Sequence, residues 1–416
     1  MPRVIPLMML LAAGSFAMSI EQPTAAQSGP APAAQELPPL PTMQSIEAPA
    51  GWKPDGHVVP HMPETLLRLP RTRITHAKYP AIDFHLHASG LTDAAAYERL
   101  IKLMNTAGLG AIVNLNGGTG ANLDAVLKAG APYKDRVANF ITLSLDGINE
   151  PGWSGRFAAE MERAFKAGAL GMKVHKTLGL DAKNPDGTYI QADDPRLDAV
   201  WDMAAKYDRP VMIHLSDSIG RFYPISQKNE RFEAGLWHAP SDTRGNYYKN
   251  GSPSPEVIEK ARENMHKKHP KTHFVNAHMA MLYYDIEKLT RFLDTYPNAD
   301  VEISATVQDL GRAPRLWREF ILKYQDRVLM GSDGSQNREV DDFWTPHWRF
   351  LETFDEYFEH PAQVRTEGGS PGHGRWNISG IGLPDDVLRK VYYENALRYL
   401  PELRASIQKQ LTVRPQ

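Results

Sequence analysis

Short apolar runs alternate with longer amphipathic stretches from about Tyr79 onward. The apolar runs are rich in β-branched side chains, which is typical of buried strands, whereas a spacing of three to four residues between apolar positions indicates helices. We expect strands at Ala81–His87, Ala111–Leu115, Val137–Leu145, Gly171–His175, Pro210–His214, His273–His278, Asp300–Ala305 and Arg327–Ser332. We expect helices between them at Asp93–Asn105, Ala158–Ala167, Arg196–Tyr207, Pro255–His269, Ile286–Tyr296 and Pro314–Tyr324.

Strands that alternate with helices indicate βα units and a parallel sheet. Eight such βα units favour a closed barrel over an open doubly wound sheet. No glycine-rich dinucleotide motif follows the first strand, which also disfavours the open sheet. The sequence therefore predicts an α/β protein of the (β/α)₈ TIM barrel class. Two connections are unusually long. Residues 216–254 follow the fifth strand, and residues 334–380 follow the eighth, where we expect a helix at Asp342–Tyr357. Loops after barrel strands lie on the catalytic face, so we expect pocket walls there, the alternative being surface loops without a role.

Residues 1–26 have the organisation of a secretory signal peptide. Arg3 supplies the positive charge, Val4–Ile20 is apolar, and small residues lead to a cleavage point after Ala26. The apolar run is shorter than the roughly 20 residues that a bilayer span requires. Pro6 also interrupts it, and both features disfavour a membrane anchor. We expect export without a stable membrane anchor, with the periplasm favoured over full secretion.

Residues 27–63 form a proline-rich linker, because nine prolines fall between Pro30 and Pro63. Such a segment favours extended conformations and does not build a core. We expect one barrel domain over residues 64–416.

Composition narrows the chemistry. The 416 residues carry 47 Lys+Arg against 49 Asp+Glu, and this balance gives no basic excess of the kind that a nucleic-acid binder shows. There is no cysteine, which excludes disulfides, thiolate metal sites and a cysteine nucleophile. We expect a small-molecule substrate, and whether the chain forms a homo-oligomer stays open.

Metal-ligand residue types stand at the ends of several predicted strands. His85 and His87 alternate along the first strand and therefore share a face. His214 ends the fifth strand, His278 ends the sixth, and Asp333 follows the eighth. Imidazole and carboxylate together suit Zn²⁺ and similar divalent ions. The pattern predicts a metal site, most simply for Zn²⁺, the alternative being structural histidines.

This ordered pattern resembles the amidohydrolase superfamily of metal-dependent (β/α)₈ barrels. Within it the chain is similar to the amidohydrolase-related (amidohydrolase 2) family, the branch that includes aminocarboxymuconate-semialdehyde decarboxylase. The resemblance covers roughly residues 79–400 and rests on the runs IDFHLH, GMKVHK, VMIHLSD, FVNAHM and MGSDG. It implies that His85, His87 and His214 bind metal. It also implies that Asp333 binds metal and moves a proton, and that His278 contacts substrate or activated water.

Lys173 bears on the number of ions. It lies on the predicted fourth strand, and His175 shares its face as a candidate pocket residue or a structural histidine. In two-metal relatives a lysine near this place is carboxylated and bridges the ions, whereas in the decarboxylase relatives it is not part of the pattern. One or two ions therefore stay open, and an unmodified Lys173 would instead pair with a carboxylate or bind a substrate anion.

The expected reaction is hydrolysis of an amide, ester or lactone bond by metal-activated water. Asp333 would move the proton and His278 would stabilise the oxyanion. One alternative is a non-oxidative decarboxylase (carboxy-lyase) of an aromatic or related carboxylic acid, and another is a catalytically inactive periplasmic binding barrel. A serine hydrolase is disfavoured because no Gly-x-Ser-x-Gly elbow occurs at a strand-to-helix turn.

Residues of the two long loops are candidates for substrate contact: Asn229, Glu230, Arg231 and Arg349. A last helix, expected at Leu383–Ala396 with Pro384 in its first turn, is interpreted as structural.

Overall fold

The computed structural model describes residues 35–36, 65–223, 229–231, 247, 251–338, 340–361 and 376–413. The expected signal peptide, nearly all of the expected linker and parts of both long loops lie outside these residues. Among the described residues, no helix has the length and apolar character that crossing a bilayer requires.

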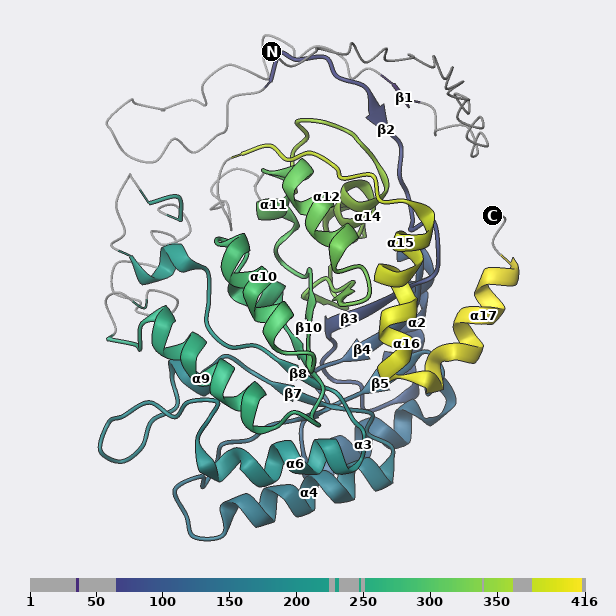
Figure 1. The fold of residues 1–416 in the computed structure, drawn as a ribbon. Coiled ribbons are helices and arrows are strands. Elements are labelled where there is room, and N and C mark those ends of the chain that lie inside the picture. Colours follow the sequence, from purple (N-terminus) through teal and green to yellow (C-terminus); the bar gives the residue numbers. More distant parts are fainter. Residues whose placement is uncertain are drawn as a thin grey trace, which may run out of the picture. The chain divides into compact units, whose positions relative to one another are not determined.

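Parallel strands form the centre of the fold, and helices surround them (Figure 1). The strands are β3 (Ala81–His87), β4 (Leu109–Asn114), β5 (Val137–Asn139), β6 (Ile141–Thr142), β7 (Met172–Val174), β8 (Val211–Ile213), β9 (Phe274–Asn276), β10 (Ala299–Glu302), β11 (Val328–Leu329) and β12 (Gly334–Ser335). Two short strands, β1 (Gln35–Glu36) and β2 (Arg71–Thr72), pair antiparallel outside this set.

The strands close into one ring. Hydrogen bonding gives the orders β12-β3-β4-β5 and β11-β10-β9-β8-β7-β6. β5 and β6 are halves of the third strand, and β11 and β12 belong to the eighth, so the two sheets are arcs of one barrel. The Phe84 N–H donates to the Met330 carbonyl at 3.0 Å, which joins the first strand to the eighth. The prediction of a (β/α)₈ TIM barrel is confirmed.

The third strand was expected as one element, Val137–Leu145, and that expectation is wrong. The strand divides at Phe140, whose N–H donates to Asn114 on β4 at 3.0 Å. The N–H of Ile141 donates instead to Gly171, which precedes β7, also at 3.0 Å. The backbone thus bonds β4 up to Phe140 and β7 beyond it, and the Leu143 N–H still donates to Lys173 at 2.8 Å.

The outer helices are α2 (Ala94–Ala107), α3 (Gly120–Gly130), α4 (Trp153–Ala167), α6 (Asp198–Lys206), α9 (Pro255–Lys268), α10 (Ile286–Thr295) and α12 (Pro314–Lys323). Local sequence sets their ends. Asp93 caps α2 by accepting the Ala96 N–H at 2.8 Å, and Gly108 ends it at a φ of 79°, which glycine adopts without strain.

The helix expected at Asp342–Tyr357 is shorter and interrupted. It consists of α13 (Val340–Phe343) and α14 (Thr345–Glu352), with Pro346 in the first turn of α14. Proline lacks an N–H and fits only the first turn of a helix, so a new helix has to begin there.

The expected last helix is present with a different geometry. It runs through α15 (Asp385–Arg389), the π-helical turn η5 (Lys390–Glu394) and α16 (Asn395–Tyr399), and α17 (Arg404–Val413) follows it. Pro384 caps α15 rather than lying in its first turn. The Val391 carbonyl accepts the Met330 N–H at 3.0 Å, so this helix holds the eighth strand in place.

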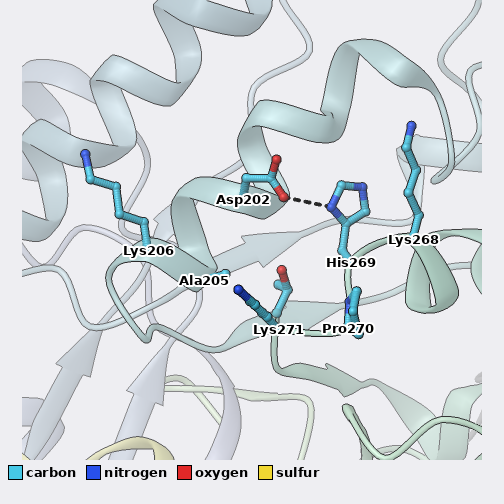
Figure 2. Close-up of a pocket in the computed structure, with 8 residues that line it drawn as sticks. Asp202, Ala205, Lys206, Lys268, His269, Pro270 and Lys271 are labelled. Carbon is cyan, nitrogen blue, oxygen red and sulfur yellow. Dashed lines mark hydrogen bonds and ion pairs between the residues drawn. The ribbon is translucent and has the colours of Figure 1, made fainter.

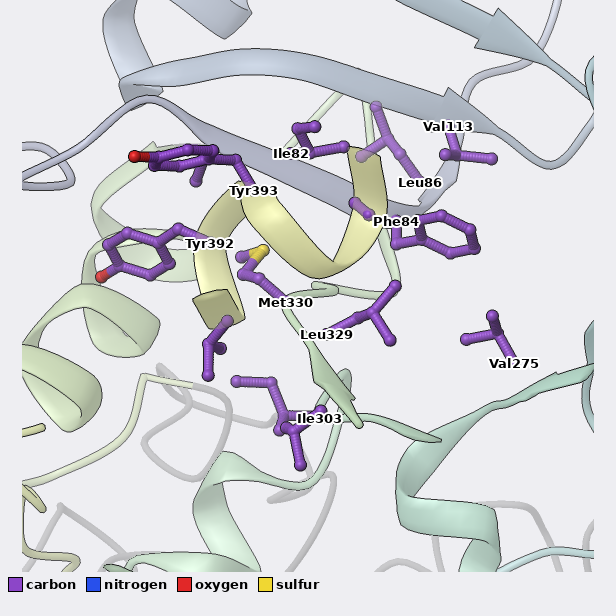
Figure 3. Close-up of a cluster of buried hydrophobic side chains, with 14 of the residues drawn as sticks. Ile82, Phe84, Leu86, Val113, Val275, Ile303, Leu329, Met330, Tyr392 and Tyr393 are labelled. Carbon is purple, nitrogen blue, oxygen red and sulfur yellow. The ribbon is translucent and has the colours of Figure 1, made fainter. Parts of the chain in front are cut away.

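Side chains alternate along β3, as a strand requires. Ile82, Phe84 and Leu86 lie in a buried apolar cluster with Tyr392 and Tyr393 of the C-terminal helix (Figure 3). The residues that alternate with them, Asp83, His85 and His87, therefore face the barrel interior.

Candidate metal centre

Three side chains inside the barrel converge on one point. His85 Nε2 lies 3.3 Å from His87 Nε2 and 3.3 Å from Asp333 Oδ1, and His87 Nε2 lies 3.2 Å from the same oxygen. Ligands at 2.0–2.1 Å from a tetrahedral zinc ion stand about 3.3 Å apart. The triangle therefore has the dimensions of one face of such a site.

The histidine tautomers fit metal binding. His85 Nδ1–H donates to Glu302 Oε1 at 2.9 Å, and His87 Nδ1–H donates to Asn116 Oδ1 at 2.8 Å. The Asn116 amide is oriented by its NH₂ group, which donates to Ser89 at 2.8 Å. Each ring thus turns an Nε2 lone pair toward the other. A cation bound by both nitrogens removes the repulsion between these lone pairs. The residues present fit a divalent ion.

A second group, His85, His278 and Glu302, also has metal-ligand composition. The hydroxyl of Ser304 occupies its centre, at 2.9 Å from both His85 Nδ1 and His278 Nδ1 and 2.7 Å from Glu302 Oε1. Glu302 also accepts the His278 N–H at 2.8 Å and the Ser304 N–H at 2.5 Å. This group leaves no space for an ion, and it orients the imidazoles instead.

His278 pairs with His214. The Nδ1–H of His278 donates to the Ser304 carbonyl at 2.8 Å, which leaves Nε2 as an acceptor 3.3 Å from His214 Nδ1. A neutral His278 therefore presents a lone pair, and the oxyanion role expected for it would need the doubly protonated ring. The pair places a second set of ligand-type nitrogens beside the triangle.

The chain turns left-handed directly after β9. His278, Met279, Ala280 and Met281 all have φ between 53° and 58°, a region that residues with a Cβ rarely adopt. Buried Arg262 of α9 donates to the Ala280 carbonyl. The strained turn is thus held by Arg262 at the Ala280 carbonyl and by Glu302 and Ser304 at His278. These contacts fix the position of the His278 ring.

Lys173 lies inside the cluster. Its Nζ is 3.2 Å from His85 Nε2, and its side chain is fully buried. Burial lowers the pKa of Lys173 to about 8, although the carboxylates of Asp333 and Glu302 act in the opposite direction. A divalent ion nearby would lower this pKa further by repulsion of like charge. The neutral amine that carboxylation requires is therefore accessible.

Two aspartates shape the electrostatics. Burial opposes ionisation of Asp333, but the imidazoles of His85 and His87 outweigh it and hold the pKa of that carboxyl well below its usual range. Asp83 is fully buried, and burial raises its pKa to about 6 against hydrogen bonds from Ser332 and Trp344. Because Asp83 accepts the N–H groups of His85 at 3.1 Å and Ser332 at 3.0 Å, it ties the first strand to the eighth beside the ligands.

His175 borders the cluster. Its ring is stacked on the His87 ring with centroids 5.8 Å apart and planes 25° apart. Burial, reinforced by Lys173 and His87, lowers the pKa of His175 to about 4. It is therefore a neutral ring next to the ligands, in keeping with the pocket role considered for it.

The loop candidates have partners of their own rather than joining the cluster. Arg231 is 3% exposed and bonds both oxygens of Asp309 at 2.8 Å. Asn229 donates to Gly220 at 2.8 Å, and Glu230 pairs with Arg312 at 3.0 Å.

Arg349 is also engaged elsewhere. It bonds Asp355 at 2.7 Å and lies over the Phe358 ring. The four loop residues thus stabilise the loops and their supports, and substrate contact by them stays a prediction.

Sequence reasoning missed Glu302, Ser304 and Asn116. The signal for two of them is visible in Val301-Glu302-Ile303-Ser304, where polar and apolar residues alternate at the end of a buried strand. Such alternation indicates that one face of the strand points into a polar interior. Asn116 follows β4 by two positions, and nothing local distinguishes it from an ordinary loop residue.

A surface hollow lies away from this chemistry. It is lined by Asp202, Lys206, Lys268, His269 and Lys271, among others, where β8 and β9 begin (Figure 2). The ring of His269 bonds Asp202 at 2.9 Å and Asp198 at 3.0 Å. Catalytic groups of barrels stand at the opposite, carboxyl ends of the strands, so we assign this hollow no part in the site.

Comparison with solved structures finds barrels of low identity. A 2,6-dihydroxybenzoate decarboxylase from Rhizobium is 16% identical, with a TM-score of 0.47, and the match covers 78% of this chain and 99% of that one. A manganese-containing dihydroxybenzoic acid decarboxylase from a Polaromonas species is 14% identical (TM-score 0.45; 79% and 99% covered). A 4-oxalomesaconate hydratase from Rhodopseudomonas palustris is 14% identical (TM-score 0.46; 80% and 99% covered).

No protein with a curated description matches the sequence. The amidohydrolase family model (Amidohydro_2) matches residues 82–401, which include every barrel strand, apart from Ala81 at the start of β3, and every residue of the cluster. The chain therefore belongs to the amidohydrolase family, and its histidine and aspartate cluster is that of a metal-dependent enzyme.

Proposed function

We propose that the chain is a zinc-dependent hydrolase of a small amide, ester or lactone, with Lys173 carboxylated between two ions. The observation that carries the proposal is the position of Lys173: a fully buried amine 3.2 Å from a ligand nitrogen, with its pKa lowered to about 8. An ammonium group beside a divalent ion is repelled, whereas a carbamate is a negatively charged oxygen ligand. The second pair of nitrogens, on His214 and His278, supplies the further ligands that two ions need.

Residues of this chain carry out the proton transfers. A bound zinc-class ion supplies Lewis acidity, which acidifies water and polarises a carbonyl oxygen. Asp333 is a carboxylate beside both histidines, so it accepts the proton of the attacking water. It then delivers that proton to the leaving amine or alcohol, while OH joins the carbonyl carbon.

Turnover of amide, ester and lactone libraries by the purified metal-loaded protein in ¹⁸O-labelled water tests the proposal. We expect one ¹⁸O atom in the acid product and about a hundredfold or greater loss of turnover in Asp333→Asn. Elemental analysis has to show that the variant keeps its metal. Full turnover by metal-loaded Asp333→Asn would refute the proton role.

Carboxylation of Lys173 has its own readout. Protein equilibrated with ¹³C-bicarbonate is expected to show a carbamate resonance that Lys173→Gln lacks, together with two ions per chain in the wild type. One ion per chain and no carbamate would refute the two-metal form and leave a single-metal site at His85, His87 and Asp333.

Decarboxylation of an aromatic or related acid is the second candidate, and the names of the solved structures favour it, since two of the three are decarboxylases. It requires the same ligands, with Lys173 as an ammonium that faces the departing carboxylate. Release of CO₂ from an aromatic acid library, without ¹⁸O incorporation, would establish this reaction in place of hydrolysis.

We propose further that the protein acts after export, because residues 1–26 have the pattern of a signal peptide. Fractionation followed by N-terminal sequencing tests this: a periplasmic chain that begins at Gln27 is expected. An uncleaved cytoplasmic chain would contradict it.

A further inference from the structure

Lys176 lies next to the metal centre without belonging to it. It follows His175, whose ring is stacked on His87, and so it stands at the carboxyl end of β7 with the ligands. The carboxyl ends of barrel strands form the catalytic face, so Lys176 lies on the same face as the candidate ligands. The Lys176 side chain is 40% exposed, so the charge is open to the catalytic face.

Asp217 holds this ammonium in position. Asp217 Oδ2 lies 2.6 Å from Lys176 Nζ and accepts the Tyr247 hydroxyl at 3.2 Å, while Oδ1 accepts the Ser218 N–H at 2.7 Å. Arg221 lies 3.3 Å from the same Oδ1, so two cations share this carboxylate. The anchor is buried, and although burial opposes ionisation, Lys176 and Arg221 hold the pKa of Asp217 at about 2. This charged, fixed carboxylate holds the Lys176 side chain in one orientation, whereas an unpaired lysine would be mobile in solvent.

The Lys176 ammonium has N–H donors that Asp217 does not occupy. A lysine carries three N–H donors, and among the described residues Asp217 is the one hydrogen-bond acceptor of Lys176. Because the side chain is 40% exposed, the remaining N–H groups are accessible to a bound molecule at the carboxyl end of β7. An ammonium in such a place attracts anions by charge and by charge-assisted hydrogen bonds.

We propose that Lys176 binds an anionic group of the substrate, in the first instance a carboxylate, next to the metal centre. This inference rests on the proposed function only in that the bound molecule is its substrate. It restricts the substrate class to amides, esters or lactones that carry a carboxylate near the bond to be cleaved. If the reaction is decarboxylation, the same ammonium holds a carboxylate that does not react.

Calorimetric titration of zinc-loaded protein with succinate and glutarate, and with their neutral diamides, tests the proposal. We expect the diacids to bind the wild type at least about tenfold tighter than they bind Lys176→Met, because one charge-assisted contact is lost. Lys176→Arg is expected to retain most of the affinity, and the diamides are expected to bind all variants alike.

Lys206→Met is the matched control, because Lys206 is also an ion-paired lysine, 3.1 Å from Glu162 on the outer helices. It is expected to bind the diacids as the wild type does. Failure of the wild type to bind either diacid at 10 millimolar, or equal affinity of the wild type and Lys176→Met, would overturn the proposal.

Folding of the variants and their binding of diacids are measured in separate experiments. Should Lys176→Met not fold, as judged by circular dichroism, Lys176→Gln replaces it with the same expected loss. The ¹⁸O experiment on the wild type does not depend on these titrations, so its failure refutes hydrolysis while a Lys176-dependent diacid site still stands.

Discussion

Glu302→Gln is the most informative perturbation of the metal centre. In the native protein Oε1 accepts from His85 Nδ1–H, the His278 N–H and the Ser304 hydroxyl, and Oε2 accepts the Ser304 N–H. A glutamine whose amide oxygen takes the place of Oε1 keeps the first three bonds. Its NH₂ group then faces the Ser304 N–H, so two donors oppose each other in a fully buried site.

The magnitude follows from that arrangement. One hydrogen bond to a charged group is lost, at about 1.5–3 kcal/mol, and a buried donor is left unsatisfied, at about 1–3 kcal/mol. We expect the free energy of unfolding of the metal-free protein to fall by about 3–5 kcal/mol. Loss of the carboxylate also makes His85 a weaker ligand, so zinc affinity is expected to fall by about 10–100-fold.

Urea titration of metal-free protein measures the first effect, and competition with a coloured chelator measures the second. Glu259→Gln is the control, because Glu259 is likewise hydrogen-bonded, to Tyr284 at 2.6 Å and Lys288 at 3.0 Å, but belongs to α9 outside the barrel. Zinc affinity of folded Glu302→Gln within twofold of the wild type would refute the assignment of Glu302 as the group that orients His85.

Three further predictions concern stability. Burial raises the pKa of Glu352 to about 7, so its native carboxyl carries an unfavourable charge above that pH. Glu352→Gln is therefore expected to raise the free energy of unfolding by up to about 3 kcal/mol at pH 8 and to leave it unchanged near pH 4. Identical urea curves at pH 8 would contradict this. Arg231→Met is expected to destabilise the protein by about 2–4 kcal/mol, because it removes the buried cation that bonds both oxygens of Asp309 and leaves only the half-exposed Arg312, at 3.5 Å, beside that carboxylate. Adding Asp309→Asn should restore part of the loss, and no recovery in thermal unfolding would count against the pairing. Ala305 has a φ of 47°, so Ala305→Gly is expected to stabilise by about 0.5–1 kcal/mol. Ala95→Gly, in the exposed part of α2, is expected to cost about 1 kcal/mol, and a loss of stability in both variants would refute the strain at Ala305.

Strand and helix positions could be predicted because local patterns decide them. β3 lies at Ala81–His87 as expected, and α9 and α10 begin at the residues their patterns indicate. Where prediction failed, distant partners decided the outcome. Phe140 divides the third strand because its N–H finds a partner on β4, and the π-helical turn frees the Val391 carbonyl for the eighth strand.

The candidate ligands could be named from sequence because a residue type at the end of a strand is a local property. His85, His87 and Asp333 stand there in the sequence, and the barrel brings them to one point. Their orientation could not be named. Glu302 follows His85 by more than two hundred residues, and its hydrogen bond exists only when the barrel closes and the inward-facing side chains of β10 and β3 meet.

The sequence by itself thus determined the barrel, its family and the candidate ligands, because alternation along strands and the chemistry of single residues are readable one segment at a time. Tertiary structure alone decided which residues orient the ligands, that Arg231 and Arg349 bind carboxylates of their own chain, and that Lys176 is aimed by Asp217. The physical reason is that hydrogen bonds and ion pairs act over a few ångströms in space, and their partners are chosen only when segments far apart in the chain come together.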